Sequence, residues 1–99
     1  MLIGRVVGTV VATRKESSLD GLKFLLVQRT LPNGELSDNF VVAADSVGAG
    51  QGDLILYAAG SSARQTSVTK DRPVDTTVMA IVDLVEEDGK FAYRKDNDN

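Results

Sequence analysis

The chain has 99 residues, of which 42% are hydrophobic and 25% are charged, and its formal net charge is −3. A chain of this length forms one compact domain with a single modest core, and its charge gives no positive field that would attract nucleic acid or anionic lipid. It has no cysteine and no histidine, which excludes disulfides, thiolate and imidazole metal ligands, and every catalytic triad that needs those residues. We therefore expect a protein that is not an enzyme and has no cofactor or metal site.

No part of the sequence predicts a membrane segment or a leader. The longest purely apolar stretch, 54–59, is far shorter than the roughly 20 residues that cross a bilayer. The first residues, 1–5, lack the basic segment followed by an apolar one that marks a secretory leader. These features predict a soluble, cytoplasmic protein.

The first half of the chain predicts three strands. Its apolar residues fall in short runs rich in Val, Ile, Leu and Thr, which is typical of strands rather than amphipathic helices. The first run, 2–13, alternates well and is followed by a polar loop over 14–19. The second run, 22–31, has apolar residues on both sides. The sequence Leu-Pro-Asn-Gly at 31–34 predicts a hairpin turn, with a third strand over 36–44.

The middle of the chain predicts a fourth strand between two irregular segments. A glycine-containing loop at 45–52 precedes the strand, which we place at 53–59. Ser62, with Gln65 three positions later, fits a capping box and predicts one short helix of one or two turns. Residues 66–75 follow as an irregular connection that contains a proline.

The last part of the chain predicts one long strand and one short one. We place the long core strand at 77–87, followed by a turn at Asp88-Gly89. Phe91 and Tyr93 would then lie on one side of a final short strand, because side chains two positions apart share a face.

Together these elements predict an all-β fold: a small closed antiparallel β-barrel of about five to six strands, similar to oligonucleotide/oligosaccharide-binding barrels, with one short helix. Residues 1–93 would form this single domain, and 94–99 a charged, flexible C-terminal tail. The runs 22–31 and 77–85 carry large aliphatic residues on both sides, whereas a small barrel buries only one face of each strand. We therefore expect a homo-oligomer.

Three groups of residues invite a chemical interpretation, and in each case the simpler structural one is preferred. The glycines of 48–52 do not have the spacing of a phosphate-binding loop and precede a strand, so we interpret them as a turn. Ser61 and Ser62 with Lys70 lack the Ser-x-x-Lys spacing of a nucleophile pair. The acidic residues at 86–88 belong to a turn.

Two further points stay open at this stage. Asp83 interrupts an apolar strand, and we hypothesise that it pairs with Arg64 or Arg72. The aromatic residues are few and are not interleaved with lysine or arginine as in a nucleic-acid-binding barrel, so we assign them to the core; they are Phe24, Phe40, Tyr57, Phe91 and Tyr93.

Five segments in this order resemble the EutN/CcmL family of bacterial microcompartment vertex proteins, over nearly the whole chain. They are GTVVAT at 8–13, LDGLKFL at 19–25, ADSVGAG at 44–50, GSSAR at 60–64, and PVD at 73–75 continuing into AIVD at 80–83. The resemblance implies a small barrel that assembles into a homopentamer at the five-fold vertices of a protein shell whose facets are tiled by hexameric proteins. The form of 61–65 is closer to members from catabolic metabolosomes than to carboxysomal ones.

Carried over to this sequence, the resemblance points to eight residues as the assembly interface: Gly48, Ala49, Gly50, Ser61, Ser62, Ala63, Arg64 and Asp83. Glycine permits close backbone approach, and Arg64 offers several donors to a neighbour. The alternative is that these segments only stabilise the subunit's own turns. The alternative function is an oligomeric barrel that binds a small anion or single-stranded nucleic acid.

Overall fold

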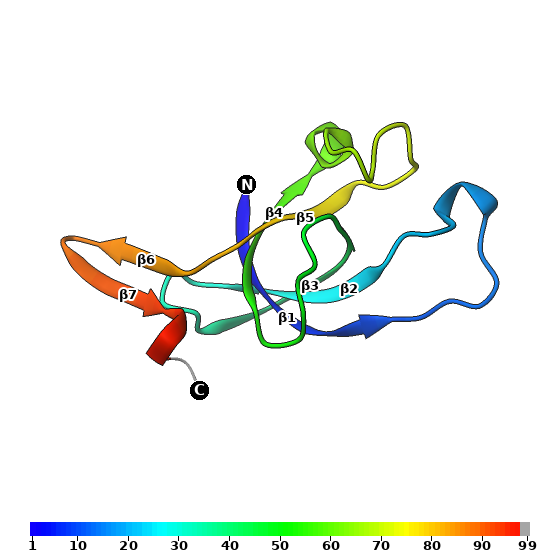
Figure 1. The fold of residues 1–99 in the computed structure, drawn as a ribbon. Coiled ribbons are helices and arrows are strands. Elements are labelled where there is room, and N and C mark those ends of the chain that lie inside the picture. Colours follow the sequence, from blue (N-terminus) through cyan, green and yellow to red (C-terminus); the bar gives the residue numbers. More distant parts are fainter. Residues whose placement is uncertain (98–99) are drawn as a thin grey trace.

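The computed structural model describes residues 1–97 and shows an all-β chain with three short 3-10 turns (Figure 1). No helix in the described part of the chain is long and apolar enough to cross a membrane. The elements in chain order are β1 Leu2–Val10, η1 Ser17–Leu19, β2 Phe24–Thr30, β3 Leu36–Asp45, β4 Leu54–Ala59, η2 Gly60–Arg64, β5 Thr76–Ile81, β6 Leu84–Glu87, β7 Lys90–Arg94 and η3 Lys95–Asn97.

Five strands close into a barrel in the order β1-β2-β3-β5-β4, which confirms the predicted fold class. Every neighbouring pair is antiparallel except β3 and β5, which run parallel and pair Ala44 with Thr77 and Asp45 with Val78. The expectation of an entirely antiparallel barrel is therefore wrong at this one seam. The reason is topological, because strand direction cannot alternate all the way round a closed ring with an odd number of strands.

The core lies inside the barrel and is built from alternating positions of its strands. In β2, Leu25 and Val27 are fully buried, while Phe24 and Leu26, at the alternate positions, face outward and are half-buried. Inward-facing side chains from the other strands complete the cluster: Val6, Ala43, Ile55, Tyr57 and Val78, with Ala49 from the loop before β4. The outer face of β2 is therefore apolar as predicted, and it is only partly covered within the subunit.

The prediction of one long strand over 77–87 is wrong, because the chain leaves the barrel after β5. The backbone N–H of Val82 still donates to the carbonyl of Leu54 at 2.8 Å, but the carbonyl of Asp83 accepts from Lys95 instead, also at 2.8 Å. From Leu84 onward the strand pairs with β7, in a separate two-stranded sheet. Figure 1 shows this hairpin projecting from one end of the barrel.

The final strand also differs from the prediction, because β7 contains a bulge. Tyr93 pairs with Val85 and Phe91 pairs with Glu86, so that Ala92 is an extra residue in β7. A bulge of one residue reverses the alternation, and Phe91 therefore lies on the face opposite to Tyr93. Tyr93 is 7% exposed, whereas Phe91 is 55% exposed.

The assignment of all five aromatic residues to the core is consequently wrong for two of them. Phe40 on β3 and Phe91 on β7 are 54% and 55% exposed, whereas Tyr57 is 3% exposed. The predicted tail at 94–99 begins inside an element, since Arg94 ends β7 and bonds Asp96 at 2.9 Å within the turn η3. Positions 98 and 99 lie outside the described residues.

Tyr57 gives the core a pH dependence on the alkaline side. Burial raises the pKa of its phenol above the ordinary value of 10.0, and the positive charge of Arg29 opposes this only in part. Because the folded state favours the neutral phenol, this contribution to stability is complete below the ordinary pKa and is lost as the pH rises through the folded pKa. Urea unfolding between about pH 8 and 11 tests this. As the pH rises over this range, the free energy of unfolding should fall less in the Tyr57→Phe variant than in the unmodified chain, because the variant has no phenol to ionise. Equal slopes in the two proteins would contradict this.

Candidate assembly site

The glycine loop between β3 and β4 is held by carboxylates of the same subunit. Asp45 Oδ1 accepts from the backbone N–H groups of Val47 and Ala49 at 3.1 and 3.3 Å, and Asp53 Oδ2 accepts from that of Gly50 at 2.9 Å. Gly48 has φ +77°, which favours glycine. Ala49 is fully buried, so its side chain belongs to the subunit's own core, whereas Gly48 and the neighbouring Val47, which is 40% exposed, face outward.

The segment 60–64 forms the 3-10 turn η2 rather than a capped helix. Its N-cap position is Ala59, with no side-chain hydrogen bond, and the N–H of Gln65 donates to the carbonyl of Ser62 at 3.2 Å. The predicted capping box is therefore wrong, because Ser62 lies inside the turn instead of before it. Gly60 starts the turn at φ +71°.

A buried cluster of threonines fixes η2 to the barrel, and the sequence analysis did not find it. The hydroxyls of Thr69 and Thr77 both donate to the carbonyl of Ala63, each at 2.7 Å, and all three residues are fully buried. Thr66 Oγ1 lies 2.7 Å from Thr69 Oγ1 and accepts from the Thr69 N–H at 3.0 Å. No sequence signal separates these threonines from exposed ones, since Thr69 lies in an irregular segment.

We expect Thr77→Val to lower the free energy of unfolding by about 1 kcal/mol, because it removes one buried hydrogen bond with little change in side-chain volume. Thr69→Val should cost about 1–2 kcal/mol, because it also removes the hydrogen bond between the hydroxyls of Thr66 and Thr69. The double variant should lose more than the sum, because only then does the Ala63 carbonyl lose both hydroxyl donors. Urea unfolding of the four proteins measures this coupling. Thr13→Val, at an exposed position, is the control, and additive losses would show that the two bonds act independently.

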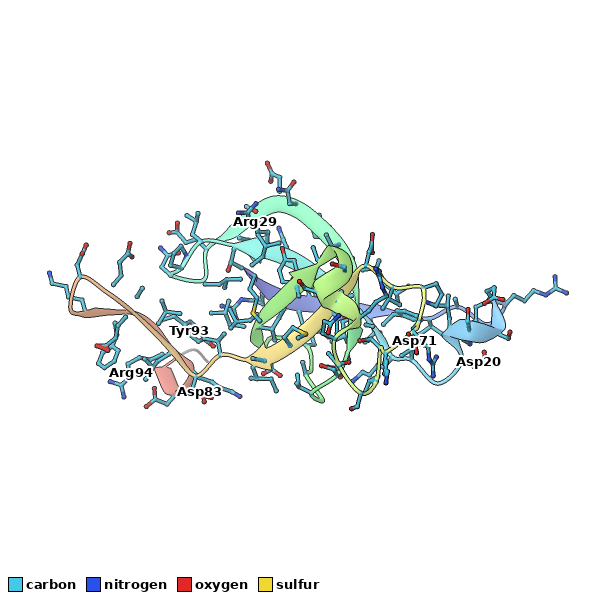
Figure 2. All side chains as sticks on the ribbon, turned by 90° about the horizontal axis from the view of Figure 1, so that it is seen from above. Asp20, Arg29, Asp71, Asp83, Tyr93 and Arg94 are labelled. Atoms are coloured by element: carbon cyan, nitrogen blue, oxygen red, sulfur yellow. The ribbon has the colours of Figure 1, made fainter. Side chains whose placement is uncertain are left out.

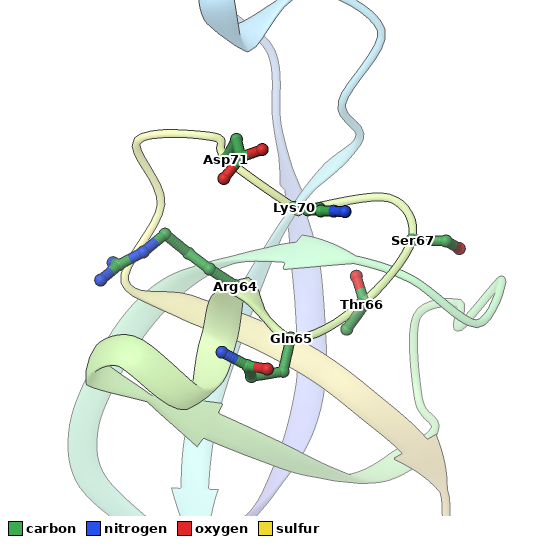
Figure 3. A pocket seen from close by; sticks show the side chains of 6 residues that line it. All are labelled: Arg64, Gln65, Thr66, Ser67, Lys70 and Asp71. Carbon is green, nitrogen blue, oxygen red and sulfur yellow. The ribbon is translucent and has the colours of Figure 1, made fainter.

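Arg64 lies at the end of η2 and is exposed. Its Nη1 donates to the carbonyl of Val74 at 3.1 Å, which leaves the rest of the guanidinium available. It borders an open hollow of about 420 Å³ lined by Arg64, Gln65, Thr66, Ser67, Lys70 and Asp71. In Figure 3 the Arg64 and Lys70 side chains point in different directions, so they do not converge on one anion.

Asp83 lies far from both arginines with which it was expected to pair. Figure 2 shows Asp83 at the hairpin end of the molecule and Asp71, which shares the hollow of Arg64, at the other end. Arg72 bonds the carbonyls of Ser18 and Asp20, at 2.8 and 2.9 Å. The hypothesis that Asp83 pairs with Arg64 or Arg72 is therefore wrong within the subunit.

The eight expected assembly residues differ in burial and in their location on the subunit. Ser61, Ser62 and Arg64 are exposed on η2, which follows the Ala59–Thr76 end of the β4–β5 pair, whereas Asp83 is exposed beyond the Ile55–Ile81 end. Ala49 and Ala63 are buried in their own subunit. The structure thus groups the residues of η2 and separates them from Asp83.

Comparison with known proteins places this fold in a family. The family model described as "Ethanolamine utilisation protein EutN/carboxysome" matches residues 1–83. The carboxysome shell vertex protein CcmL of Thermosynechococcus vestitus is 45% identical over 95 residues, which cover 96% of each chain. The bacterial microcompartment shell vertex protein PduN of Salmonella typhimurium is 46% identical over 89 residues, which cover 86% of this chain and 98% of PduN.

Solved structures agree with these relatives. CcmL of Gloeobacter violaceus superimposes with a TM-score of 0.92 at 46% identity, covering 97% of this chain and 99% of that one. The pentameric microcompartment shell protein GrpN of Rhodospirillum rubrum gives a TM-score of 0.80 at 41% identity, covering 88% of this chain and 99% of GrpN. Since the family model spans the whole barrel and the relatives match over nearly their full length, this chain belongs to the EutN/CcmL family.

Proposed function

We propose that this chain forms a homopentamer that caps the five-fold vertices of a bacterial microcompartment shell, closing facets made of hexameric shell proteins. The observation that carries the proposal is the full-length match to relatives named shell vertex proteins, together with the structural match to pentameric GrpN. A flat hexagonal layer closes only where five-fold units replace six-fold ones, so this role depends on the shape of the ring.

The subunit has the features that such a structural role requires. Large apolar side chains remain exposed, among them Val11 just after β1 and Phe91 on β7, and burial against other subunits would cover such surface. The chain also lacks cysteine and histidine, which a protein that works by shape does not need. These points support a non-enzymatic component, and the relatives' names as shell vertex proteins support a location in a microcompartment shell.

Within the ring, we assign direct contacts to the exposed members of the expected interface, which are Ser61, Ser62, Arg64 and Asp83. Gly48 and Gly50 would allow a neighbour's backbone to approach. Ala49 and Ala63 would act indirectly, by holding the two loops in shape from inside the core. Arg64 follows one end of the β4–β5 pair and Asp83 follows the other, so a ring would bring these two side chains together only across an interface between subunits.

The type of compartment remains a proposal based on residues 61–65, which favour a catabolic metabolosome. Overall identity does not separate the two types, because the carboxysomal CcmL of T. vestitus and the microcompartment protein PduN are 45% and 46% identical to this chain.

Native mass spectrometry tests the ring directly. We expect a dominant species of five subunits, and we expect Arg64→Ala to raise the protein concentration needed for half-assembly on the order of tenfold, since an interface arginine is a frequent hot spot. Arg29→Ala, at another exposed arginine on β2, is the matched control. A monomeric unmodified chain would contradict the proposed function.

A second experiment tests vertex capping. Hexameric shell proteins of the same compartment are co-produced with and without this chain and examined by electron microscopy. We expect closed polyhedra only with the chain present, and extended sheets or tubes without it. Closed polyhedra in both samples would contradict the vertex role even if the pentamer forms.

A further inference from the structure

The subunit is elongated and its two ends differ in character. It measures 46 × 23 × 23 Å along its principal axes. Figures 1 and 2 both place the β6–β7 hairpin at one end and the loop between β1 and β2 at the other. A head-to-tail ring needs two different surfaces that complement each other, and these two ends are candidates for them.

The hairpin is a two-stranded sheet attached to the barrel only near its base. The guanidinium of Arg5 lies 5.9 Å from the ring centre of Tyr93, and Lys95 Nζ lies 3.9 Å from the carboxylate of Asp53. An isolated hairpin is only marginally stable in water, so a second surface that covers it would stabilise it.

The side of the hairpin turned away from Tyr93, which we call the hairpin face, carries two exposed apolar side chains and one free carboxylate. Leu84 and Phe91 are 51% and 55% exposed, and Glu86 pairs with Phe91 across the strands. Arg94 lies on the same face, with its guanidinium 4.9 Å from the ring centre of Phe91 and 2.9 Å from the carboxylate of Asp96. Glu87 lies on the other side of the hairpin, opposite Lys90. Glu86 has no ion-pair partner among residues 1–97.

The opposite end presents a hollow of matching character, which we call the loop-end hollow. Its volume is about 340 Å³, and its lining includes the apolar side chains of Val10, Val11, Leu22 and Phe24 together with Lys15 and Lys23. Val11 is 83% exposed. Each ammonium group donates to one backbone carbonyl at 3.3 Å, and neither has a carboxylate partner in the described part of the chain.

We propose that the hairpin face of one subunit docks into the loop-end hollow of the next subunit in the ring. Leu84 and Phe91 would pack against the apolar lining, while Glu86 would approach Lys15 and Lys23. The contact is heterologous, because it joins two different surfaces, and it therefore repeats around a ring until the ring closes. The inference rests on the homopentamer proposed above and names the surfaces that hold it together.

Charge reversal tests the pairing of the two surfaces. Lys15→Glu with Lys23→Glu, and separately Glu86→Lys, are each expected to raise the concentration for half-assembly at least on the order of tenfold, because like charges then face each other. A chain with all three substitutions should assemble at a lower concentration than the chain with the two lysine substitutions alone. Native mass spectrometry reads the subunit number, and circular dichroism confirms that each variant is folded.

Mixing tests the head-to-tail geometry. A chain with Leu84→Ser and Phe91→Ser keeps an intact hollow, and a chain with Lys15→Glu and Lys23→Glu keeps an intact hairpin face. Each variant alone should be largely monomeric. For the serine variant, the protein concentration needed for half-assembly should rise on the order of thirtyfold. Mixed together, they should form a dimer with one copy of each chain and no ring, because only one interface remains intact.

Substitutions outside both surfaces provide the controls. Glu35→Lys with Asp38→Lys reverses two exposed acidic residues near the start of β3, and Leu36→Ser removes an apolar side chain that is 53% exposed. Both should keep the ring. An intact ring in the reversed or serine variants, or a triple variant that assembles no better than the double lysine variant, would overturn this inference while the pentamer stands. A monomeric unmodified chain would instead refute the proposed function itself.

Discussion

Leu25→Ala is expected to lower the free energy of unfolding by about 3 kcal/mol, a large part of the 5–15 kcal/mol that is typical for a single domain. Leu25 lies in β2, is fully buried and belongs to the cluster that fills the barrel. Removing its branched end loses apolar burial and leaves a cavity, because the neighbouring Val6 and Val27 are fixed on strands whose backbones are paired on both sides.

Urea unfolding at several protein concentrations measures this loss and separates it from any contribution of assembly. Leu31→Ala is the matched control, because Leu31 is 51% exposed in the turn after β2 and should lose well under 1 kcal/mol. A loss at Leu25 no larger than that at Leu31 would show that the barrel interior relaxes to fill the space.

Gly4→Ala is expected to cost about 2 kcal/mol for the opposite reason, since it adds volume where none is available. A Cβ at Gly4 would lie 2.7 Å from Val27 Cγ1, 2.8 Å from Tyr57 Cε1 and 3.0 Å from the carbonyl oxygen of Gln28. The first two atoms belong to buried core side chains and the third to the backbone of β2, so none of them moves away without disturbing the core.

Gly8 provides the control within the same strand. A Cβ there would meet only Leu26 Cβ, at an ordinary 3.9 Å, and Gly8→Ala should be neutral or stabilising by a few tenths of a kcal/mol through the entropy of the unfolded chain. Unfolding of the two alanine variants by urea compares the positions directly. Equal stabilities would mean that β1 shifts to accommodate the extra methyl group at position 4.

The strands of the barrel were predictable because local patterns determine them. The turn signal at Leu31-Pro32-Asn33-Gly34 lies between β2 and β3 as expected, and the alternation of β2 places Leu25 and Val27 inside. The end of β5 was not predictable, because the apolar run continues through Val82 while the pairing partner changes from β4 to β7. A change of partner depends on the rest of the fold and leaves no local mark.

The exposed side chains show the same limit. Phe91 and Tyr93 are two positions apart and were assigned to one face, but the extra residue Ala92 reverses that relation. At the candidate site, the grouping of Ser61, Ser62 and Arg64 follows from their adjacency in sequence. The two threonines that hold Ala63 come from a loop and from β5, and only the folded barrel brings them together.

The short parallel seam between β3 and β5 has a consequence for the order of folding. β1, β2 and β3 join through connections between consecutive strands, whereas the seam joins Ala44 to Thr77 across the whole of β4 and η2. Closing such a long loop costs more entropy than forming a local hairpin, so we expect the seam to form after the hairpins. The pairing of β1 with β4, which joins Leu2 to Tyr57, closes a still longer loop and should also form late. Until the seam forms, the edges of β3 and β5 are open and can pair with strands of another chain. When many copies of this chain are made at once, each barrel therefore has to close before such pairing leads to aggregation.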